Sequence, residues 1–309
     1  MPAAFWIELA AFFLGLLLGS FLNVCISRVP RGESVIQPRS RCGSCQTPIA
    51  WHDNIPVLSW ILLSAHCRQC KAPIPWRYPA VELATGIWFA LSAAVLHHTL
   101  FGTGATLTTD QSIRLALDAI GVAALGFGLI GLAVIDWQTQ ILPDAFTIGG
   151  AAFGFLIACT QAIFLDSGEG DIHLAPRVRI SSPGSSAAHG DVFLTGPEAL
   201  VLGRLAAILG AAGVLLLIRA TYKALRGREG MGLGDAKLMA MIAGFLGFGD
   251  AMLSFFVGMI ACAAYAVILL ARGRATAATK LPLGSFLAAG GLFTALLGEA
   301  ALTWYKGLL

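Results

Sequence analysis

The sequence predicts an all-α polytopic membrane protein of about eight transmembrane helices, with one small polar insertion after the first helix. Hydrophobic residues make up 57% of the 309 residues, and only 12% are charged. A soluble domain usually carries about 25% charged residues, whereas the mean hydropathy here is +0.78. Apolar runs of the roughly 20 residues that cross a bilayer recur along the chain. These observations exclude an ordinary soluble domain.

Eight apolar runs are the expected spans. The sixth is shorter than the others, so we expect it to be tilted, re-entrant or merged with its neighbour. In order, the spans cover residues 5–27, 81–100, 113–135, 144–165, 197–218, 236–248, 250–271 and 284–305.

Lysine and arginine predict the orientation of the chain. Fifteen of the 20 basic residues fall in the segments 28–80, 219–237 and 272–280. By the positive-inside rule these three segments are cytoplasmic, and both termini are outside. The Ser-, Gly- and Pro-rich segment 166–196 is then an outer loop, for which we expect no chemistry.

The first span has a second interpretation as a cleaved signal peptide. The run 5–27 is long, lacks a basic start and continues into Arg28 rather than a small-residue cleavage site, so a retained helix is favoured. Asn23 lies inside this run and needs a hydrogen-bond partner, from helix packing or from a substrate.

The polar segment 28–80 contains two CxxC pairs. Four thiolates on two tight turns suit tetrahedral Zn²⁺ in a structural site, which predicts a zinc-ribbon-like insertion. A segment of about 50 residues buries little core, so a metal would supply folding energy. Disulfides are disfavoured in a reducing cytoplasm, and a redox CxxC does not explain two matched copies. The expected ligands are Cys42, Cys45, Cys67 and Cys70.

Carboxylates lie at the borders of three spans. Glu82 begins the second span and is either functional or simply solvated at the membrane surface. Asp136 closes the run 113–135, where the negative end of the helix dipole disfavours an ionised carboxylate. Asp144, in Leu142-Pro143-Asp144, has a structural alternative as the N-cap of the next helix.

A glycine-rich turn precedes the sixth span and ends in an aspartate. Gly232 and Gly234 permit backbone conformations that other residues avoid, and Asp235 follows them directly. The pattern is not a phosphate loop, because no GxxxxGK[ST] is present. Lys237 either orients Asp235 or only contributes to the positive-inside bias.

Asp136 and Asp235 are the expected catalytic pair. An ionisable side chain at the mouth of a membrane helix is a functional-site hypothesis by default. We expect no other acid in the apolar core. Two close carboxylates can share one proton and activate water for amide hydrolysis. The alternative class, a transporter or proton relay, would place its acids near mid-span. The last two spans are expected to serve packing alone.

The chain resembles the bacterial type IV prepilin peptidases, which are membrane aspartic proteases of the GxGD kind that also serve type II secretion. The motifs that carry the resemblance extend over nearly the whole length. They are Gly19-Ser20-Phe21-Leu22-Asn23-Val24 with Arg28 and Pro30, both CxxC pairs, Asn54-Ile55-Pro56 with Ser59-Trp60, Arg77-Tyr78-Pro79 with Glu82, the D-x₅-LPD segment 136–144, and Gly232-x-Gly234-Asp235-x-Lys237.

The resemblance implies cleavage of a basic leader after a glycine in prepilins or pseudopilins, at the cytoplasmic face of the bacterial inner membrane, with both termini periplasmic. It implies catalysis by Asp136 and Asp235, with Asp144 less certainly catalytic. Bifunctional members also N-methylate the new terminus with S-adenosylmethionine, and the cysteine segment is associated with them; a monofunctional peptidase is the alternative.

The resemblance further implies three parts and a limited set of partners. The expected parts are a first helix over 1–27, a zinc segment over 28–80 and a peptidase core over 81–309. The expected partners are the pilin substrates and the lipid bilayer, with no nucleic acid.

Overall fold

The computed structural model describes residues 2–102, 108–164, 197–227, 230–273 and 280–307. Within them, regular structure is helical apart from two isolated bridges. The predicted outer loop 166–196 lies outside the described residues. The α-helices are α1 (Pro2–Arg28), α2 (Leu58–Leu62), α3 (Arg77–His97), α4 (Thr109–Thr139), α5 (Asp144–Ile163), α6 (Pro197–Arg226), α7 (Leu233–Leu246), α8 (Phe248–Ala271) and α9 (Leu283–Lys306).

Every expected span coincides with a helix, so the all-α membrane prediction is confirmed. Six of these helices, α1, α3, α4, α5, α6 and α8, are long and apolar enough to cross a bilayer. The sixth expected span, α7, has only 14 residues. It is therefore about 21 Å long, shorter than a hydrocarbon core of about 30 Å. Gly247, at φ 86°, separates α7 from α8, so the two do not form one continuous helix.

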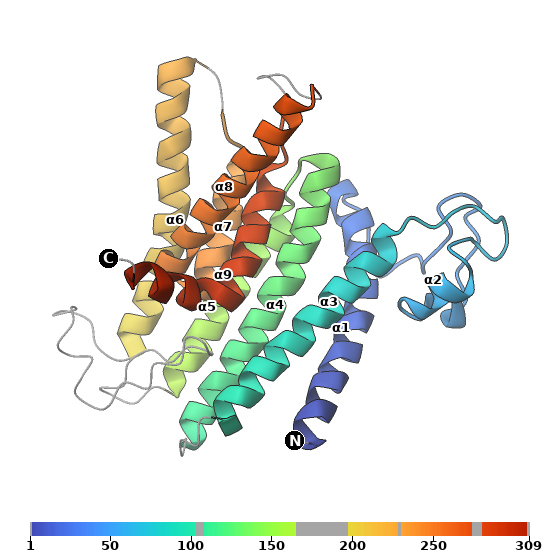
Figure 1. Ribbon diagram of the computed structural model, residues 1–309, viewed down its shortest axis with the longest axis horizontal. Coiled ribbons are helices and arrows are strands. Elements are labelled where there is room, and N and C mark those ends of the chain that lie inside the picture. The colour runs from blue at the N-terminus through green and yellow to red at the C-terminus, as the bar shows by residue number, and fades with distance from the viewer. Residues whose placement is uncertain (1, 103–107, 165–196, 228–229, 274–279, 308–309) are drawn as a thin grey trace. The chain divides into compact units, whose positions relative to one another are not determined.

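The chain divides into two compact units, Met1–Ala94 and Val95–Leu309. In the first unit, α1 and α3 approach closely because small residues lie where they cross. A Cβ added at Gly15 would lie 2.7 Å from the Thr85 carbonyl oxygen, and one at Gly19 would lie 2.7 Å from Cα of Glu82. The cysteine segment with α2 connects these two helices (Figure 1).

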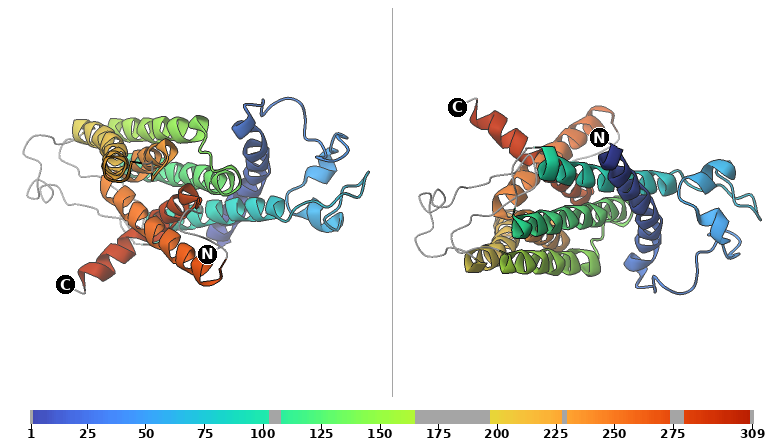
Figure 2. Two further views of the ribbon diagram at one scale, coloured as in Figure 1. Left: turned by 90° about the horizontal axis from the view of Figure 1, so that it is seen from above. Right: turned by 90° about the horizontal axis from the view of Figure 1, so that it is seen from below.

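The second unit is built around α7. This short helix packs against α5, α6, α8 and α9, while α4 runs beside α5 and α9 (Figures 1 and 2). Leu238, Met239 and Ile242 of α7 are fully buried. At the end of this unit drawn uppermost in Figure 1, α4, α6 and α8 end, and α7 and α9 begin. The borders that carry the predicted acids are therefore brought to one end of the unit.

One sequence expectation about the core is wrong. Asp118 lies within α4, so the apolar core does contain a further acid. Together with Gln161 and Arg204 it lines a cavity of about 10 Å³, the room of a single water. Gln161 and Arg204 are buried, and Arg204 Nη1 donates to the Phe245 carbonyl 3.0 Å away. An acid with such polar neighbours is tolerated inside a helix bundle.

Candidate active site and metal centre

Asp136 lies in the last turn of α4, where the helix ends because Gln140 adopts a left-handed conformation (φ 53°). Its side chain is 5% exposed. The Ser285 backbone N–H donates to Asp136 Oδ2 at 2.7 Å, and Ser285 Oγ lies 3.0 Å from the same oxygen. Ser285 is in the first turn of α9, whose N–H groups have no partner within the helix. The positive end of α9 therefore faces the Asp136 carboxylate.

Asp235 occupies the first turn of α7 and is 7% exposed. Its Oδ2 accepts the Gly232 backbone N–H at 3.0 Å, which closes the N-terminal turn of the helix. Gly232 itself is extended, so the glycine turn delivers the chain into α7 without a side chain beside the carboxylate. The glycine turn that precedes Asp235 therefore also fixes the orientation of its carboxylate.

Leu142 packs against both Gly234, next to Asp235, and Gly284, next to Asp136. A Cβ added at Gly284 would lie 2.9 Å from Cδ1 of Leu142 and 3.0 Å from Cγ of Asp136. A Cβ added at Gly234 would lie 3.0 Å from Cβ of Leu142. Absent side chains at positions 234 and 284 thus let the α4 end, the α7 turn and the α9 start meet.

The two carboxylates of this site influence each other electrostatically. They lie close enough for their charges to interact with each other and with Cys262 of α8. In each, Oδ2 is held by the contacts above, whereas Oδ1 receives no hydrogen bond from any residue that the structure describes. One oxygen of each acid is therefore fixed by the protein.

Asp144 and Lys237 form an ion pair beside this site. Lys237 Nζ lies 2.6 Å from Asp144 Oδ1, with the side chains 39% and 60% exposed. The expectation that Asp144 caps α5 is wrong, because Pro143 is the N-cap and Asp144 is the first helical residue. Lys237 contacts Asp144 rather than Asp235, since positions two apart on a helix face different directions. The pair joins the starts of α5 and α7.

Glu82 and Asn23 belong to the first unit. Glu82 is buried, and its Oε2 accepts the Val57 N–H at 2.7 Å, so the alternative of a solvated boundary residue is wrong. Asn23 Nδ2 donates to the Tyr78 carbonyl at 3.0 Å, which is the helix-packing contact considered for it. Asn23 thus joins α1 to α3, and Glu82 joins α3 to the cysteine segment.

Four cysteines of the first unit lie together as expected. The Sγ atoms of Cys42, Cys45, Cys67 and Cys70 are all within 4.8 Å of one another, so they could hold a metal ion. The Cys42 and Cys70 sulfurs are 3.8 Å apart. Four thiolates at about 2.3 Å from a tetrahedral Zn²⁺ are separated by about this distance.

The two CxxC turns repeat the same local structure. Cys42 N–H donates to Thr47 O at 3.0 Å, and Cys67 N–H donates to Ala72 O at 2.9 Å. The Thr47 hydroxyl and N–H lower the pKa of Cys45 to about 6, and the Cys70 and Gln69 N–H groups lower the pKa of Cys67. At Cys45 and Cys67 these donors favour the thiolate form, which is the form that binds metal. At Cys70 the Ala72 N–H lowers the pKa, but desolvation and the neighbouring cysteines outweigh it and raise the pKa to about 11.

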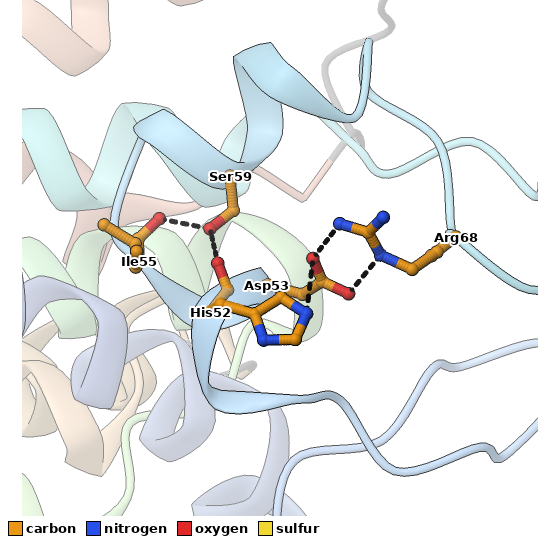
Figure 3. Close-up of polar contacts among 5 residues, drawn as sticks. All are labelled: His52, Asp53, Ile55, Ser59 and Arg68. Carbon is orange, nitrogen blue, oxygen red and sulfur yellow. Dashed lines mark hydrogen bonds and ion pairs between the residues drawn. The ribbon is translucent and has the colours of Figure 1, made fainter.

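An ion pair connects the second turn to the rest of the segment (Figure 3). Arg68 donates from Nε and Nη2 to the two carboxylate oxygens of Asp53 at 2.8 and 2.6 Å. These hydrogen bonds lower the pKa of Asp53. Ser59 Oγ lies 2.7 Å from the Ile55 carbonyl, which fixes the start of α2 beside this pair.

Sequence reasoning missed the residues that α9 contributes. The span 284–305 was expected only to pack, yet Gly284 and Ser285 contact Asp136. The available signal was Leu281-Pro282-Leu283-Gly284-Ser285, in which a proline and a glycine mark the start of a helix whose free N–H groups attract a carboxylate.

Two family models match the chain. Residues 13–96 match the model of the bacterial peptidase A24 N-terminal domain, and residues 189–267 match that of the type IV leader peptidase family. The first match contains the four cysteines, and the second contains Asp235. No solved structure matches the chain.

Curated relatives carry the name prepilin leader peptidase/N-methyltransferase. One from Burkholderia pseudomallei is 32% identical over 93% of this chain and 84% of the relative. One from Pseudomonas aeruginosa is 29% identical over 96% and 92%. A relative from Myxococcus xanthus is 34% identical over 87% of this chain, which spans 65% of that protein's length.

The fold and site define a polytopic α-helical membrane protein with two buried aspartates at helix ends and a four-cysteine cluster between its first two membrane helices. The chain belongs to the type IV leader peptidase family. The family resemblance stated from the sequence motifs is thereby confirmed.

Proposed function

We propose that this chain cleaves the leader peptide from type IV prepilins or type II secretion pseudopilins and N-methylates the new terminus. The observation that carries the proposal is that Asp136 and Asp235, from helices far apart in the sequence, are both buried and lie close enough for their charges to interact. The relatives' name covers both activities.

The site supports hydrolysis by a shared-proton pair. A water between the two Oδ1 atoms gives a proton to one carboxylate while its oxygen attacks the scissile carbonyl carbon. The other carboxyl protonates the amide nitrogen as the C–N bond breaks. One water is consumed, and a new carboxylate and a new amino terminus form.

Hydrogen bonding distinguishes the two acids. Asp136 Oδ2 accepts the Ser285 N–H at 2.7 Å at the positive end of α9, and the Ser285 hydroxyl is shared between this oxygen at 3.0 Å and the Ala133 carbonyl at 2.8 Å. Asp235 Oδ2 has a single donor, the Gly232 N–H. Because donors stabilise the ionised form, we assign Asp136 as the base and Asp235 as the acid that holds the proton.

The remaining predicted residues are assigned positioning roles. Gly232 and Gly234 shape the turn before Asp235, and the Asp144–Lys237 pair holds α5 against α7. Glu82 holds Val57 of the cysteine segment against α3. None of these three roles requires contact with the substrate.

The substrate's apolar N-terminal helix would lie among the membrane helices of this chain. Its scissile bond would then lie at the cytoplasmic ends of these helices, beside the two aspartates. The glycine before the scissile bond lets the backbone approach closely. We assign the protein to the bacterial inner membrane. The basic segments 219–237 and 272–280, which flank the site, are assigned to the cytoplasm by the positive-inside rule, and both termini are then periplasmic. We also propose three parts for the chain: a first membrane helix over 1–27, a zinc segment over 28–80 and a peptidase core over 81–309.

Zinc is the proposed metal of the cysteine cluster. Cys42, Cys45, Cys67 and Cys70 supply four thiolates, which leave no open position, so the ion would be structural. It would hold the two CxxC turns together, and no step of hydrolysis passes through it.

S-adenosylmethionine would supply the methyl group for the second activity. A groove at the end of α1 does not fit this donor, because Arg28 and Arg39 line it and no carboxylate does. The donor carries a sulfonium and an ammonium against one carboxylate, so two guanidinium groups would repel it. This groove is therefore not assigned to the methyl donor.

Ion transport by the two aspartates is the rival function. It is disfavoured because Asp136 lies in the last turn of α4 and Asp235 in the first turn of α7, not at mid-span.

Incubation of the purified protein with a prepilin and labelled S-adenosylmethionine tests the proposal by mass spectrometry. We expect a product that lacks the leader and carries one methyl group. A cleaved but unmethylated product would leave a monofunctional peptidase. An intact prepilin together with ion flux in vesicles would establish the transporter instead.

A further inference from the structure

A groove of about 310 Å³ lies in the first unit, between α1 and the chain that follows it. On one side it is lined by Leu17, Phe21 and Val24, which lie on one face of α1. The opposite wall is formed by the segment 35–40. A volume of this size lies within the range of small-molecule sites.

Two arginines give this groove a positive charge. Arg28, at the end of α1, and Arg39, on the opposite wall, both line it, and no aspartate or glutamate does. Among the residues that the structure describes, neither arginine has an ion-pair partner. Ser40 and Asn54 add neutral hydrogen-bonding groups. The groove is therefore complementary to an anionic ligand.

The wall opposite α1 is held in place by hydrogen bonds. Arg28 Nη1 donates to the Ser34 carbonyl at 2.9 Å, and Ser34 Oγ accepts the Ile36 and Gln37 N–H groups at 3.3 Å. Further along, Ile49 N–H donates to the Ser40 carbonyl at 2.9 Å, next to the first CxxC turn. The segment that forms this wall is thus tied to α1 and to the first CxxC turn.

The groove spans the depth at which a phospholipid changes from acyl chain to headgroup. Leu17 and Arg28 are eleven positions apart, so about 16 Å of helix separates them, close to half of a hydrocarbon core. Leu17 and Phe21 are 60% and 46% exposed at the apolar end. The arginines lie at the polar end, where the span stops.

We propose that this groove binds an anionic phospholipid, with its phosphate between Arg28 and Arg39 and an acyl chain along Leu17 and Phe21. The ligand's negative charge meets two otherwise unneutralised guanidinium groups, and its apolar tail covers exposed side chains of α1. A basic leader peptide would be repelled by the same charges. The groove belongs to the first unit and the aspartates to the second, so the proposal stands whether or not the chain cleaves prepilins.

Native mass spectrometry of the full chain, released from vesicles of phosphatidylglycerol and phosphatidylcholine, tests the proposal. The wild-type chain is expected to retain phosphatidylglycerol in preference to phosphatidylcholine. The variant Arg39→Gln should lower that retention about fivefold, the effect of one basic contact. The matched control is Arg31→Gln, which removes the same charge from an exposed position outside the groove and should retain the lipid.

A second variant separates the groove from bulk charge. Val24→Trp fills the groove without changing the charge, and it too should lower lipid retention while α1 stays in the membrane. Equal retention by all variants, or an equal loss in Arg31→Gln and Arg39→Gln, would overturn the proposal. Displacement of the lipid by S-adenosylmethionine would also overturn it, because the groove would then belong to the methyl donor.

Discussion

The backbone N–H of Ser285 donates to the carboxylate of Asp136 at 2.7 Å, although the two residues are 149 positions apart in the chain. This contact brings the start of the last membrane helix to the end of α4. The site is therefore built from three helix ends: the end of α4 and the start of α7, which carry the aspartates, and the start of α9.

Ser285→Ala is expected to lower the rate of leader cleavage by up to about tenfold. A full hydrogen bond to a charged group contributes about 1.5–3 kcal/mol, and the Ser285 hydroxyl divides its one proton between Asp136 Oδ2 and the Ala133 carbonyl. The loss should fall on kcat and leave KM unchanged, since Ser285 contacts Asp136 and not the substrate. Ser285→Thr, which keeps the hydroxyl, should restore most of the rate.

The matched control for this prediction is Ser254→Ala. Ser254 is also buried, and its Oγ donates to a carbonyl one turn back in α8, with no carboxylate involved. Equal rates for Ser254→Ala and Ser285→Ala would show that the hydroxyl of Ser285 has only a general packing role.

Gly284→Ala should impair cleavage more strongly than an ordinary glycine substitution. Its Cβ would lie 3.0 Å from Cγ of Asp136 and 2.9 Å from Leu142, so the carboxylate or the leucine must move. Gly149→Ala in α5 is the control, because nothing lies within 4 Å of its added Cβ. Cleavage assays on both variants, with melting temperatures as a check of folding, compare the two. Normal cleavage by Gly284→Ala would contradict the close packing at this site.

Asp144→Asn should affect cleavage far less than Asp136→Asn. The Asp144–Lys237 pair is partly exposed, and such pairs contribute about 0.2–1 kcal/mol. A small drop in melting temperature and a rate within about fivefold of the wild type are expected. If Asp144→Asn proves as damaging as Asp136→Asn, the catalytic pair has been assigned wrongly.

The double variant Cys42→Ser, Cys45→Ser should lose one equivalent of zinc, because two of the four ligands are removed. Elemental analysis of the purified membrane protein measures the loss. Cys159→Ser in α5 is the control and should keep the metal, since this cysteine lies outside the cluster. An unchanged zinc content in the double variant would refute the metal site.

The sequence predicted those parts of the site that carry their own local signal. The cysteine cluster was predicted because two CxxC turns encode the geometry of a knuckle within a few residues. Asp136 and Asp235 stood out because a charge is costly at the border of an apolar run. The apolar helices were predicted from hydropathy, and six of those that the structure describes are long enough to cross a bilayer.

The parts that could not be predicted depend on packing between distant helices. Neither Ser285 nor Gly284 is charged, so their place beside Asp136 becomes visible only when α9 is set against α4. The pairing of Lys237 with Asp144 likewise depends on how α5 and α7 are rotated. Buried Glu82 resembled a surface residue because burial near a helix end is set by the segment that covers it.

The most direct test of the catalytic pair is a comparison of prepilin cleavage by purified Asp136→Asn and Asp235→Asn with that of the wild type. An asparagine keeps the size of the side chain but cannot share a proton. Both variants are expected to fold with near-normal melting temperatures and to leave the prepilin intact in mass spectra. Cleavage at the wild-type rate by either variant would contradict the pair.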